Sequence, residues 1–243
     1  MSRHFHVGQA LTVGGVVELD PARFLRVLRK GPGDAITVCD ARGGLFRVVL
    51  RAPEAGALTG DVVAALPDPG RDAAVHVTVW LPLLKGGKSE DLVRPLTELG
   101  VAAITPLQSR HAVVRLDGQR AAERVARLSA IAAESANQCG RRIIPPISPL
   151  MNGLPPRDLL KAGARGVFFW EAGGRPSFEL QTFLNGAPAV HVLYGPEGGL
   201  APSEAEQLAA DGWEAFSLGP RILRAETAVI AGSTLVMAAL GAL

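Results

Sequence analysis

One stretch of the chain decides the fold class: His191-Val192-Leu193-Tyr194-Gly195-Pro196-Glu197-Gly198-Gly199-Leu200. An apolar run of strand length ends in a loop with three glycines, and a helical pattern follows at 202–210. In open α/β sheets, ligands bind beyond the carboxyl ends of the strands. Glycines let backbone amides approach a ligand closely. The stretch therefore predicts a ligand-binding loop at the end of a buried strand.

Two further loops follow strand-like runs in the same way. One is Phe168-Phe169-Trp170-Glu171-Ala172-Gly173-Gly174, and the other is Leu218-Gly219-Pro220-Arg221-Ile222-Leu223-Arg224-Ala225-Glu226-Thr227-Ala228. The helix macrodipole disfavours the cations Arg221 and Arg224 at a helix start, so they favour an anionic ligand or developing charge. An ion pair with Glu226 or Glu197 is the alternative. Three such loops predict one small-ligand pocket.

Strands and helices alternate through the rest of this region. The patterns predict strands over 75–81, 101–107, 166–170, 189–194 and 215–218, and helices over 89–99, 119–138, 202–210 and 226–240. Ser89 is the expected cap of the first helix and Gly100 its end, and Pro95 should kink it or shift its boundary. This alternation predicts an α/β fold with a parallel sheet covered on both faces.

The first 70 or so residues follow a different, mostly β pattern. The turn-forming cluster 40–44 lies between the strand-like runs 37–39 and 46–50, which predicts a hairpin. One helix, capped by Asp20 and ended by Gly31, should interrupt the strands. Its expected apolar face is Phe24, Leu25, Val27 and Leu28, and its basic face is Arg23, Arg26, Arg29 and Lys30. The breaker cluster 66–70 predicts a boundary between domains 1–70 and 71–243.

Composition narrows the class of protein further. The 243 residues are 48% hydrophobic and 20% charged, which is typical of a globular chain with one large or two smaller domains. The first residues lack the apolar core of a signal peptide, and no apolar run is long enough to span a membrane. Cys39 and Cys139 form neither a disulfide framework nor a zinc spacing. We expect a cytoplasmic protein whose net charge of +2 permits a nucleic-acid partner.

Four motifs together resemble one known family. They are GPEGG at 195–199, SLGPRILRAETA at 217–228, LTELGV at 96–101 and AAESANQCGR at 132–141. The run RFLRVLR at 23–29, followed by Gly33 and Asp34, is similar to the same family. The chain thus resembles the bacterial small-subunit ribosomal RNA methyltransferases of the SPOUT superfamily, which modify N3 of a uridine. The resemblance covers nearly the whole chain.

This resemblance implies a fold, a cofactor and a substrate. It implies a PUA-like β-barrel RNA-binding domain over 1–70 and, over 71–243, a SPOUT α/β methyltransferase domain tied in a trefoil knot. The cofactor would be S-adenosyl-L-methionine, leaving S-adenosyl-L-homocysteine as product, and the protein would act as a homodimer. The substrate would be the uridine U1498 of 16S rRNA in the small ribosomal subunit. Methyl transfer from a sulfonium needs no Lewis acid, so no metal is expected.

Residue roles follow from the resemblance and from the chemistry of uracil, whose N3 is a poor nucleophile until its proton leaves. Arg224, or Arg221, would stabilise the developing negative charge. Glu197 or Glu226 would accept the proton or orient an arginine. The residues implied for the cofactor are Trp170, Glu171, Leu193, Tyr194, Gly195, Pro196, Glu197, Gly198, Gly199, Leu218, Gly219, Arg221, Ile222 and Leu223. Those implied for RNA are Arg3, Arg23, Arg26, Arg29, Lys85, Lys88 and Arg141.

Some positions depart from the family pattern. Arg94 and Pro95 stand where members usually carry Gln-Lys, and the segments 85–88 and 138–141 differ in detail, which bears on substrate contacts. Two other functions stay open: the same fold acting on transfer RNA or another ribosomal position, and a non-enzymatic RNA-binding assembly factor. The arginine-rich run at 23–29 argues against the first, and the intact glycine loop argues against the second.

Overall fold

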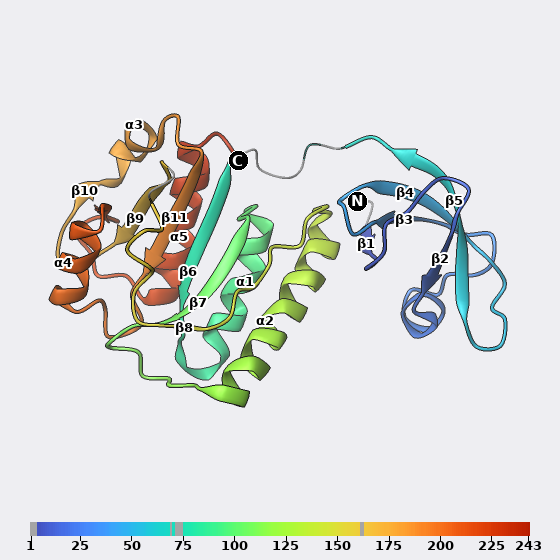
Figure 1. Ribbon diagram of the computed structural model, residues 1–243, viewed down its shortest axis with the longest axis horizontal. Helices are drawn as coiled ribbons and strands as arrows, with labels where there is room; N and C mark the ends of the chain where they lie inside the picture. Colours follow the sequence, from blue (N-terminus) through green and yellow to red (C-terminus); the bar gives the residue numbers. More distant parts are fainter. Residues whose placement is uncertain (1–3, 69, 71–74, 161–162) are drawn as a thin grey trace. The chain divides into compact units, whose positions relative to one another are not determined.

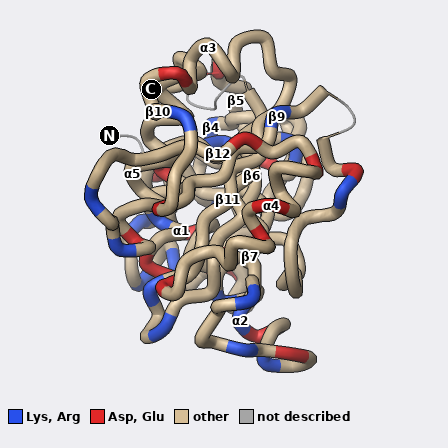
Figure 2. The backbone as a smooth tube through the Cα atoms, turned by 90° about the vertical axis from the view of Figure 1, so that its left-hand side faces the viewer, with Lys and Arg blue, Asp and Glu red and all other residues tan. Residues whose placement is uncertain are grey.

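A computed structural model describes residues 4–68, 70, 75–160 and 163–243. The chain forms two compact units, one of Met1–Asp72 with Ala136–Ile144, the other of Ala73–Ser135 with Pro145–Leu243. The sequence did not indicate that the segment Ala136–Ile144 groups with the first unit. Acidic and basic residues are interspersed along the chain (Figure 2). No helix in the described residues is long and apolar enough to cross a membrane.

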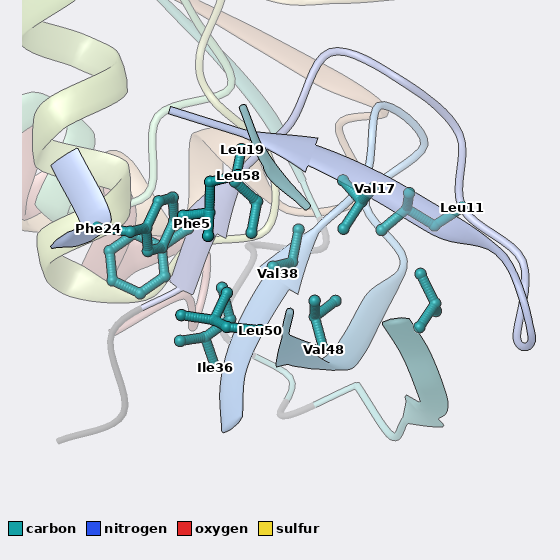
Figure 3. Packing of buried hydrophobic residues seen from close by; sticks show 11 residues of the cluster. Phe5, Leu11, Val17, Leu19, Phe24, Ile36, Val38, Val48, Leu50 and Leu58 are labelled. Carbon is teal, nitrogen blue, oxygen red and sulfur yellow. The ribbon is translucent and has the colours of Figure 1, made fainter. Parts of the chain in front are cut away.

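The smaller unit is built around one five-stranded sheet (Figure 1). Its order is β1-β3-β4-β5-β2, with β1 and β3 parallel and the other pairs antiparallel. The predicted hairpin is confirmed, because β3 and β4 pair antiparallel on either side of the turn. In the turn, Asp40 Oδ1 accepts the backbone N–H groups of Arg42 and Gly44 at 2.9 and 2.7 Å. Buried residues such as Val17, Val38 and Val48 form the core of this unit (Figure 3). The strands are β1 (His4–His6), β2 (Val16–Leu19), β3 (Ala35–Cys39), β4 (Leu45–Leu50) and β5 (Leu58–Leu66).

The helix expected after Asp20 is shorter than predicted and is a π-helical turn, Ala22–Val27. Asp20 does hold its start, since its Oδ1 accepts the N–H of Ala22 at 2.9 Å. The wider turn places Phe24 in the core against Phe5, with ring centroids 4.9 Å apart. Val27, expected on the apolar face, is instead 75% exposed. The α-helical spacing used in the prediction does not hold for a π turn.

The segment Ala136–Ile144 is joined to the strands of this unit by polar contacts. The backbone N–H of His6 donates to Asn137 Oδ1 at 3.1 Å, and the ring Nε2 of His6 lies 3.1 Å from the carbonyl oxygen of Arg142. The Arg142 guanidinium pairs with Asp68, just after β5, at 2.5 Å. Residues more than 60 positions away in the sequence therefore complete the smaller unit.

The larger unit contains a seven-stranded, all-parallel sheet of order β10-β12-β9-β11-β6-β7-β8 (Figure 1). Parallel pairing confirms the prediction drawn from alternating strands and helices. The strands are β6 (His76–Pro82), β7 (Ala103–Gln108), β8 (Met151–Asn152), β9 (Arg165–Phe169), β10 (Arg175–Pro176), β11 (Ala189–Tyr194) and β12 (Trp213–Ser217). The helices are α1 (Lys88–Glu98), α2 (Gly118–Cys139), α3 (Leu180–Leu184), α4 (Pro202–Ala210) and α5 (Ala225–Ala239).

Helices cover both faces of this sheet. Successive strand side chains point to opposite faces, and the neighbours Leu193 and Tyr194 on β11 show the division. Leu193 belongs to a buried cluster that includes Leu208 of α4. Tyr194 points the other way, and its hydroxyl lies 2.9 Å from Ser233 Oγ on α5. Burial on both faces is the usual condition of an all-parallel sheet.

The start of α1 differs from the prediction. Ser89 is not its cap, because the helix begins at Lys88 and the buried Ser89 hydroxyl accepts the N–H of Leu84 at 2.8 Å. Pro95 lies inside the helix, which continues to Glu98. Gly100, with φ of 94°, follows the end of the helix as expected.

We predict that Asn137→Ala lowers the free energy of unfolding of the smaller unit by about 1–3 kcal/mol. The substitution removes the acceptor of the His6 backbone N–H in a partly buried contact. Urea unfolding, followed by a probe in the smaller unit, measures this effect. Asn185→Ala is the control: Asn185 is exposed, and its substitution should change stability by less than about 0.5 kcal/mol. Equal effects of the two substitutions would contradict the assigned role of Asn137.

Candidate active site

The carboxyl ends of three neighbouring strands, β12, β9 and β11, meet at one cavity of about 410 Å³. Its size is within the usual range of small-ligand sites, about 300–1,000 Å³. The three loops singled out in the sequence contribute most of its lining, and the start of α5 completes it. The lining residues are Lys88, Phe169, Trp170, Glu171, Tyr194, Gly195, Pro196, Glu197, Gly199, Ser217, Leu218, Gly219, Arg221, Ile222, Leu223, Arg224, Ala225, Glu226 and Ala228.

An aromatic pair forms part of the lining of this cavity. The rings of Phe169 and Tyr194 are stacked, with centroids 5.4 Å apart and planes 12° apart. Gly232 of α5 makes the arrangement possible, because a Cβ there would lie 2.6 Å from the Phe169 ring and 2.8 Å from the Tyr194 hydroxyl oxygen. Burial raises the pKa of Tyr194, so its phenol stays neutral. The hydroxyl group forms a hydrogen bond with Ser233. The pair therefore forms a rigid apolar wall.

The glycine loop after β11 is tightly folded on itself. A Cβ on Gly195 would lie 3.0 Å from the backbone C of Gly199 and from the backbone N of Leu200. Gly199 has φ of 69°, and its N–H donates to the carbonyl oxygen of Pro196 at 2.9 Å. Gly195 is thus needed for close packing and Gly199 for its positive φ. Without side chains, both leave the loop backbone at the surface of the cavity.

Three carboxylates, including Glu171, and three cations line the cavity, and Glu197 and Glu226 are not paired with the arginines as the sequence suggested. Glu197 Oε1 accepts the backbone N–H of Lys85 at 3.0 Å, and Glu226 Oε1 forms an ion pair with Lys88 Nζ at 2.6 Å. The hydrogen bond from Lys88 lowers the pKa of the Glu226 carboxyl. Among the described residues, no acid lies within 4.0 Å of the side-chain nitrogens of Arg221 or Arg224. These two guanidiniums therefore remain available to a ligand.

The cavity collects most, but not all, of the residues expected to bind the cofactor. Leu193 does not line it, because its side chain is fully buried in the cluster on the opposite face of the sheet. Gly198 does not line it either. Its carbonyl oxygen lies 3.1 Å from His111 Nδ1, and a Cβ at Gly198 would lie 3.0 Å from the Cβ of His111. The glycine at position 198 therefore accommodates the loop after β7.

The residues expected to contact RNA are dispersed. Lys88 lines the cavity itself, whereas Lys85 does not, although its backbone N–H donates to the lining residue Glu197. Arg141 is only 4% exposed, so it is not an open surface cation. Arg23 and Arg26 lie in the π-helical turn and Arg29 lies just after it; the Arg23 guanidinium carbon is 5.2 Å from the centre of the Phe5 ring. Arg3 lies outside the described residues.

Sequence reasoning missed the place of Lys88 at the cavity and the contributions of Phe169, Ser217, Ala225 and Ala228. Phe169, Ala225 and Ala228 lie within the quoted loops and Ser217 directly precedes one of them, but none of the four was assigned to the site. Lys88 was visible as part of the segment Lys85-Gly86-Gly87-Lys88, but its partner Glu226 is 138 positions away. Only the three-dimensional structure reveals that pair.

We predict that Gly195→Ala lowers the affinity of the cavity for its ligand at least tenfold. The added methyl group meets backbone atoms of Gly199 and Leu200, which cannot move away without distorting the loop. Isothermal titration with S-adenosylmethionine, a test ligand that the sequence resemblance suggests, measures the change, and circular dichroism checks folding. Gly31→Ala is the control, because a Cβ at Gly31 meets nothing within 4 Å. Wild-type affinity in Gly195→Ala would contradict the account of the loop.

Comparisons with known proteins agree with these observations. A family model for the RNA methyltransferase domain matches residues 71–237. The ribosomal RNA small subunit methyltransferase E of Mycobacterium bovis is 30% identical over 206 residues, covering 83% of this chain and 77% of that protein. The Bacillus subtilis protein of the same name is 29% identical over 214 residues, covering 84% and 81%.

A solved structure extends the likeness to both units. The structure of the ribosomal RNA small subunit methyltransferase E from Neisseria gonorrhoeae, bound to S-adenosyl methionine, has a TM-score of 0.84 and 26% identity to this chain. The match covers 98% of each chain. The chain belongs to the RNA methyltransferase family, among the ribosomal RNA small subunit methyltransferases E.

Proposed function

We propose that this protein transfers a methyl group from S-adenosylmethionine to N3 of a uridine, U1498, in the 16S RNA of the small ribosomal subunit. The observation that carries the proposal is the cavity at the ends of β12, β9 and β11, with Arg221 and Arg224 at its edge. Family membership and the relatives' names support the substrate class.

The residues of the cavity fit S-adenosylmethionine. Gly219 has φ of 107°, and a Cβ there would meet nothing within 4 Å, so its backbone is open to a ligand. The stacked Phe169 and Tyr194 rings offer an apolar wall, and the backbone of Gly195, Gly199 and Leu218 offers amide and carbonyl groups along the cavity. When bound, the cofactor supplies a methyl group on a sulfonium, which is electrophilic without a metal.

The chain's own residues would provide orientation and charge stabilisation. The uracil ring acquires negative charge, spread over its two carbonyl oxygens, as N3 loses its proton. A guanidinium held at the cavity edge stabilises that charge more strongly than water does, because it is already oriented. Arg224 lies directly before the first residue of α5, so it is the residue we assign to this role, with Arg221 beside it. Holding the two reactants in line contributes the rest of the rate enhancement.

The smaller unit would supply RNA affinity. The five-stranded sheet supports a PUA-like RNA-binding domain, and the exposed Arg26 and Arg29 suit phosphate contacts. We further propose that the carboxyl-terminal part of the larger unit is tied in a trefoil knot, that the protein acts as a homodimer and that it works in the cytoplasm. The sequence resemblance supports these three points.

The proposed function has a direct test. Purified small ribosomal subunits that lack the modification are incubated with the protein and S-adenosylmethionine, and the RNA nucleosides are identified by mass spectrometry. The expected product is 3-methyluridine at one position. A ribose-methylated product, or methylation of transfer RNA alone, would favour the other substrates. Tight RNA binding without any methylated product would favour an assembly factor.

We predict that Arg224→Ala lowers the single-turnover methylation rate by about 10²–10³. The affinity for S-adenosylmethionine should stay within about tenfold, or roughly 1.4 kcal/mol, of the wild type. Quench-flow methylation and isothermal titration measure the two effects. Arg157→Ala is the control, since the side chain of Arg157 is 77% exposed and lies outside the cavity lining. A near-normal rate, or loss of cofactor affinity, would contradict this role and make Arg221 the better candidate for stabilising the uracil anion.

We predict that Arg26→Glu with Arg29→Glu weakens binding to small ribosomal subunits and reduces the dependence of affinity on salt. Fewer phosphate contacts release fewer counterions, so the slope of log affinity against log salt should fall by about 1–2. Arg23 is left intact because it stacks on Phe5. Arg42→Glu, in the exposed hairpin turn of the same unit, controls for a change of charge alone. An unchanged slope would mean that this face only contacts solvent.

A further inference from the structure

Two of the three carboxylates that line the cavity, those of Glu197 and Glu226, are engaged with one short segment, Lys85–Lys88, which leads from β6 into α1. Glu197, on the glycine loop after β11, accepts the backbone N–H of Lys85 at 3.0 Å. Glu226, in the first turn of α5, pairs with the Lys88 ammonium group at 2.6 Å. Two acids from separate elements thus hold the two ends of the segment.

The segment is also fixed by its own backbone. Gly86 and Gly87 have φ of 63° and 81°, a left-handed conformation that favours glycine. Directly after it, the buried Ser89 hydroxyl donates to the carbonyl oxygen of Pro82 at 3.0 Å and accepts the N–H of Leu84 at 2.8 Å. The path of the chain from β6 into α1 is therefore well defined, and so is the position of Lys88.

These contacts leave the Lys88 ammonium group partly free at the cavity. An ammonium has three N–H donors, and Glu226 accepts one of them. The Lys88 side chain is 41% exposed, and the residue lines the cavity together with Arg221 and Arg224. A lysine at the first position of a helix is disfavoured by the macrodipole, so helix stability alone does not explain it.

The same contacts make the two acids poor candidates for proton acceptors. The hydrogen bond from Lys88 lowers the pKa of Glu226, which weakens that carboxylate as a base. Glu197 already accepts an amide proton at Oε1. A general base works best when its pKa lies near the operating pH, so a lowered carboxyl pKa makes Glu226 less suited to remove the N3 proton of uracil.

We propose that Glu197 and Glu226 are positioning residues for the segment Lys85–Lys88, and that Lys88 is a catalytic cation that donates to a carbonyl oxygen of the uracil anion. This inference rests on the proposed function. Solvent hydroxide takes the N3 proton and becomes water. The N3 electron pair then forms the bond to the methyl carbon, and the carbon–sulfur bond breaks with its electron pair left on sulfur. Neither Glu197 nor Glu226 takes the proton.

Glutamine and alanine variants of the two acids separate positioning from base catalysis. A glutamine keeps an oxygen acceptor but cannot act as a base. We expect Glu197→Gln to stay within about threefold of the wild-type single-turnover rate and Glu197→Ala to fall at least tenfold. Glu226→Gln, which keeps a hydrogen bond to Lys88 but loses the ion pair, should lie between the wild type and Glu226→Ala. In every variant the rate should rise with pH as in the wild type, because hydroxide is the base.

Lys88→Met tests the catalytic cation while preserving most of the side chain's length. Its kcat should fall about 10²–10³-fold, with KM for the small subunit and affinity for S-adenosylmethionine within about threefold. Arg157→Met, outside the cavity lining, is the control for loss of one positive charge. If Lys88→Met instead raises KM and reduces the salt dependence, Lys88 binds an RNA phosphate and the assignment is overturned.

A measurement without methylation separates this inference from the proposed function. Hydrogen exchange of the Lys85 backbone amide should be slow in the wild type and in Glu197→Gln, and at least tenfold faster in Glu197→Ala. Equal exchange in all three would overturn the positioning role, whatever the substrate proves to be. Loss of methylation in Glu197→Gln, with slow exchange retained, would identify Glu197 as the base and contradict the proposal. Absence of 3-methyluridine from the wild-type product would count against the proposed function, and with it the catalytic role of Lys88, but would leave the positioning role of Glu197 standing.

Discussion

The parallel pairing of β12, β9 and β11 is the constraint on which the site depends. Parallel strands place their carboxyl ends at the same edge of a sheet. Three loops separated by as many as about 50 residues in sequence thereby line one cavity. Both faces of the sheet are also buried, so the loops leave strands that are packed between two layers of apolar side chains. A cavity with rigid walls can hold a ligand and a substrate in line at little entropic cost.

Close packing between α5 and the sheet also fixes the position of α5. The Phe169 and Tyr194 rings are stacked against Gly232, where a side chain would not fit. Tyr194 and Ser233 satisfy each other's hydroxyl groups inside that contact. The position of α5 is therefore fixed relative to the sheet, and with it the loop that carries Arg221 and Arg224 and the turn that carries Glu226. The positions of these three charged side chains therefore depend on the packing of α5 against the sheet.

Local patterns predicted most of the larger unit. The run 189–194 and the helix 202–210 coincide with β11 and α4, because alternating burial and a proline near the helix start are local signals. Long-range contacts were beyond such reasoning. The ion pair of Lys88 with Glu226, the contact of Gly198 with His111 and the return of Ala136–Ile144 to the smaller unit all join residues far apart in the sequence. The π-helical turn was missed because six residues are too few for the sequence pattern to distinguish it from an α-helix.

The most direct measurement of the central claim is a titration of S-adenosylmethionine into the isotopically labelled protein, followed by the backbone amide resonances. The largest changes are expected at Glu171, Gly195 and Gly219, which follow β9, β11 and β12 and line one cavity. Amides of the smaller unit should show only minor changes. Changes confined to one of the three loops, or centred in the smaller unit, would contradict a single cofactor cavity at the carboxyl ends of β12, β9 and β11.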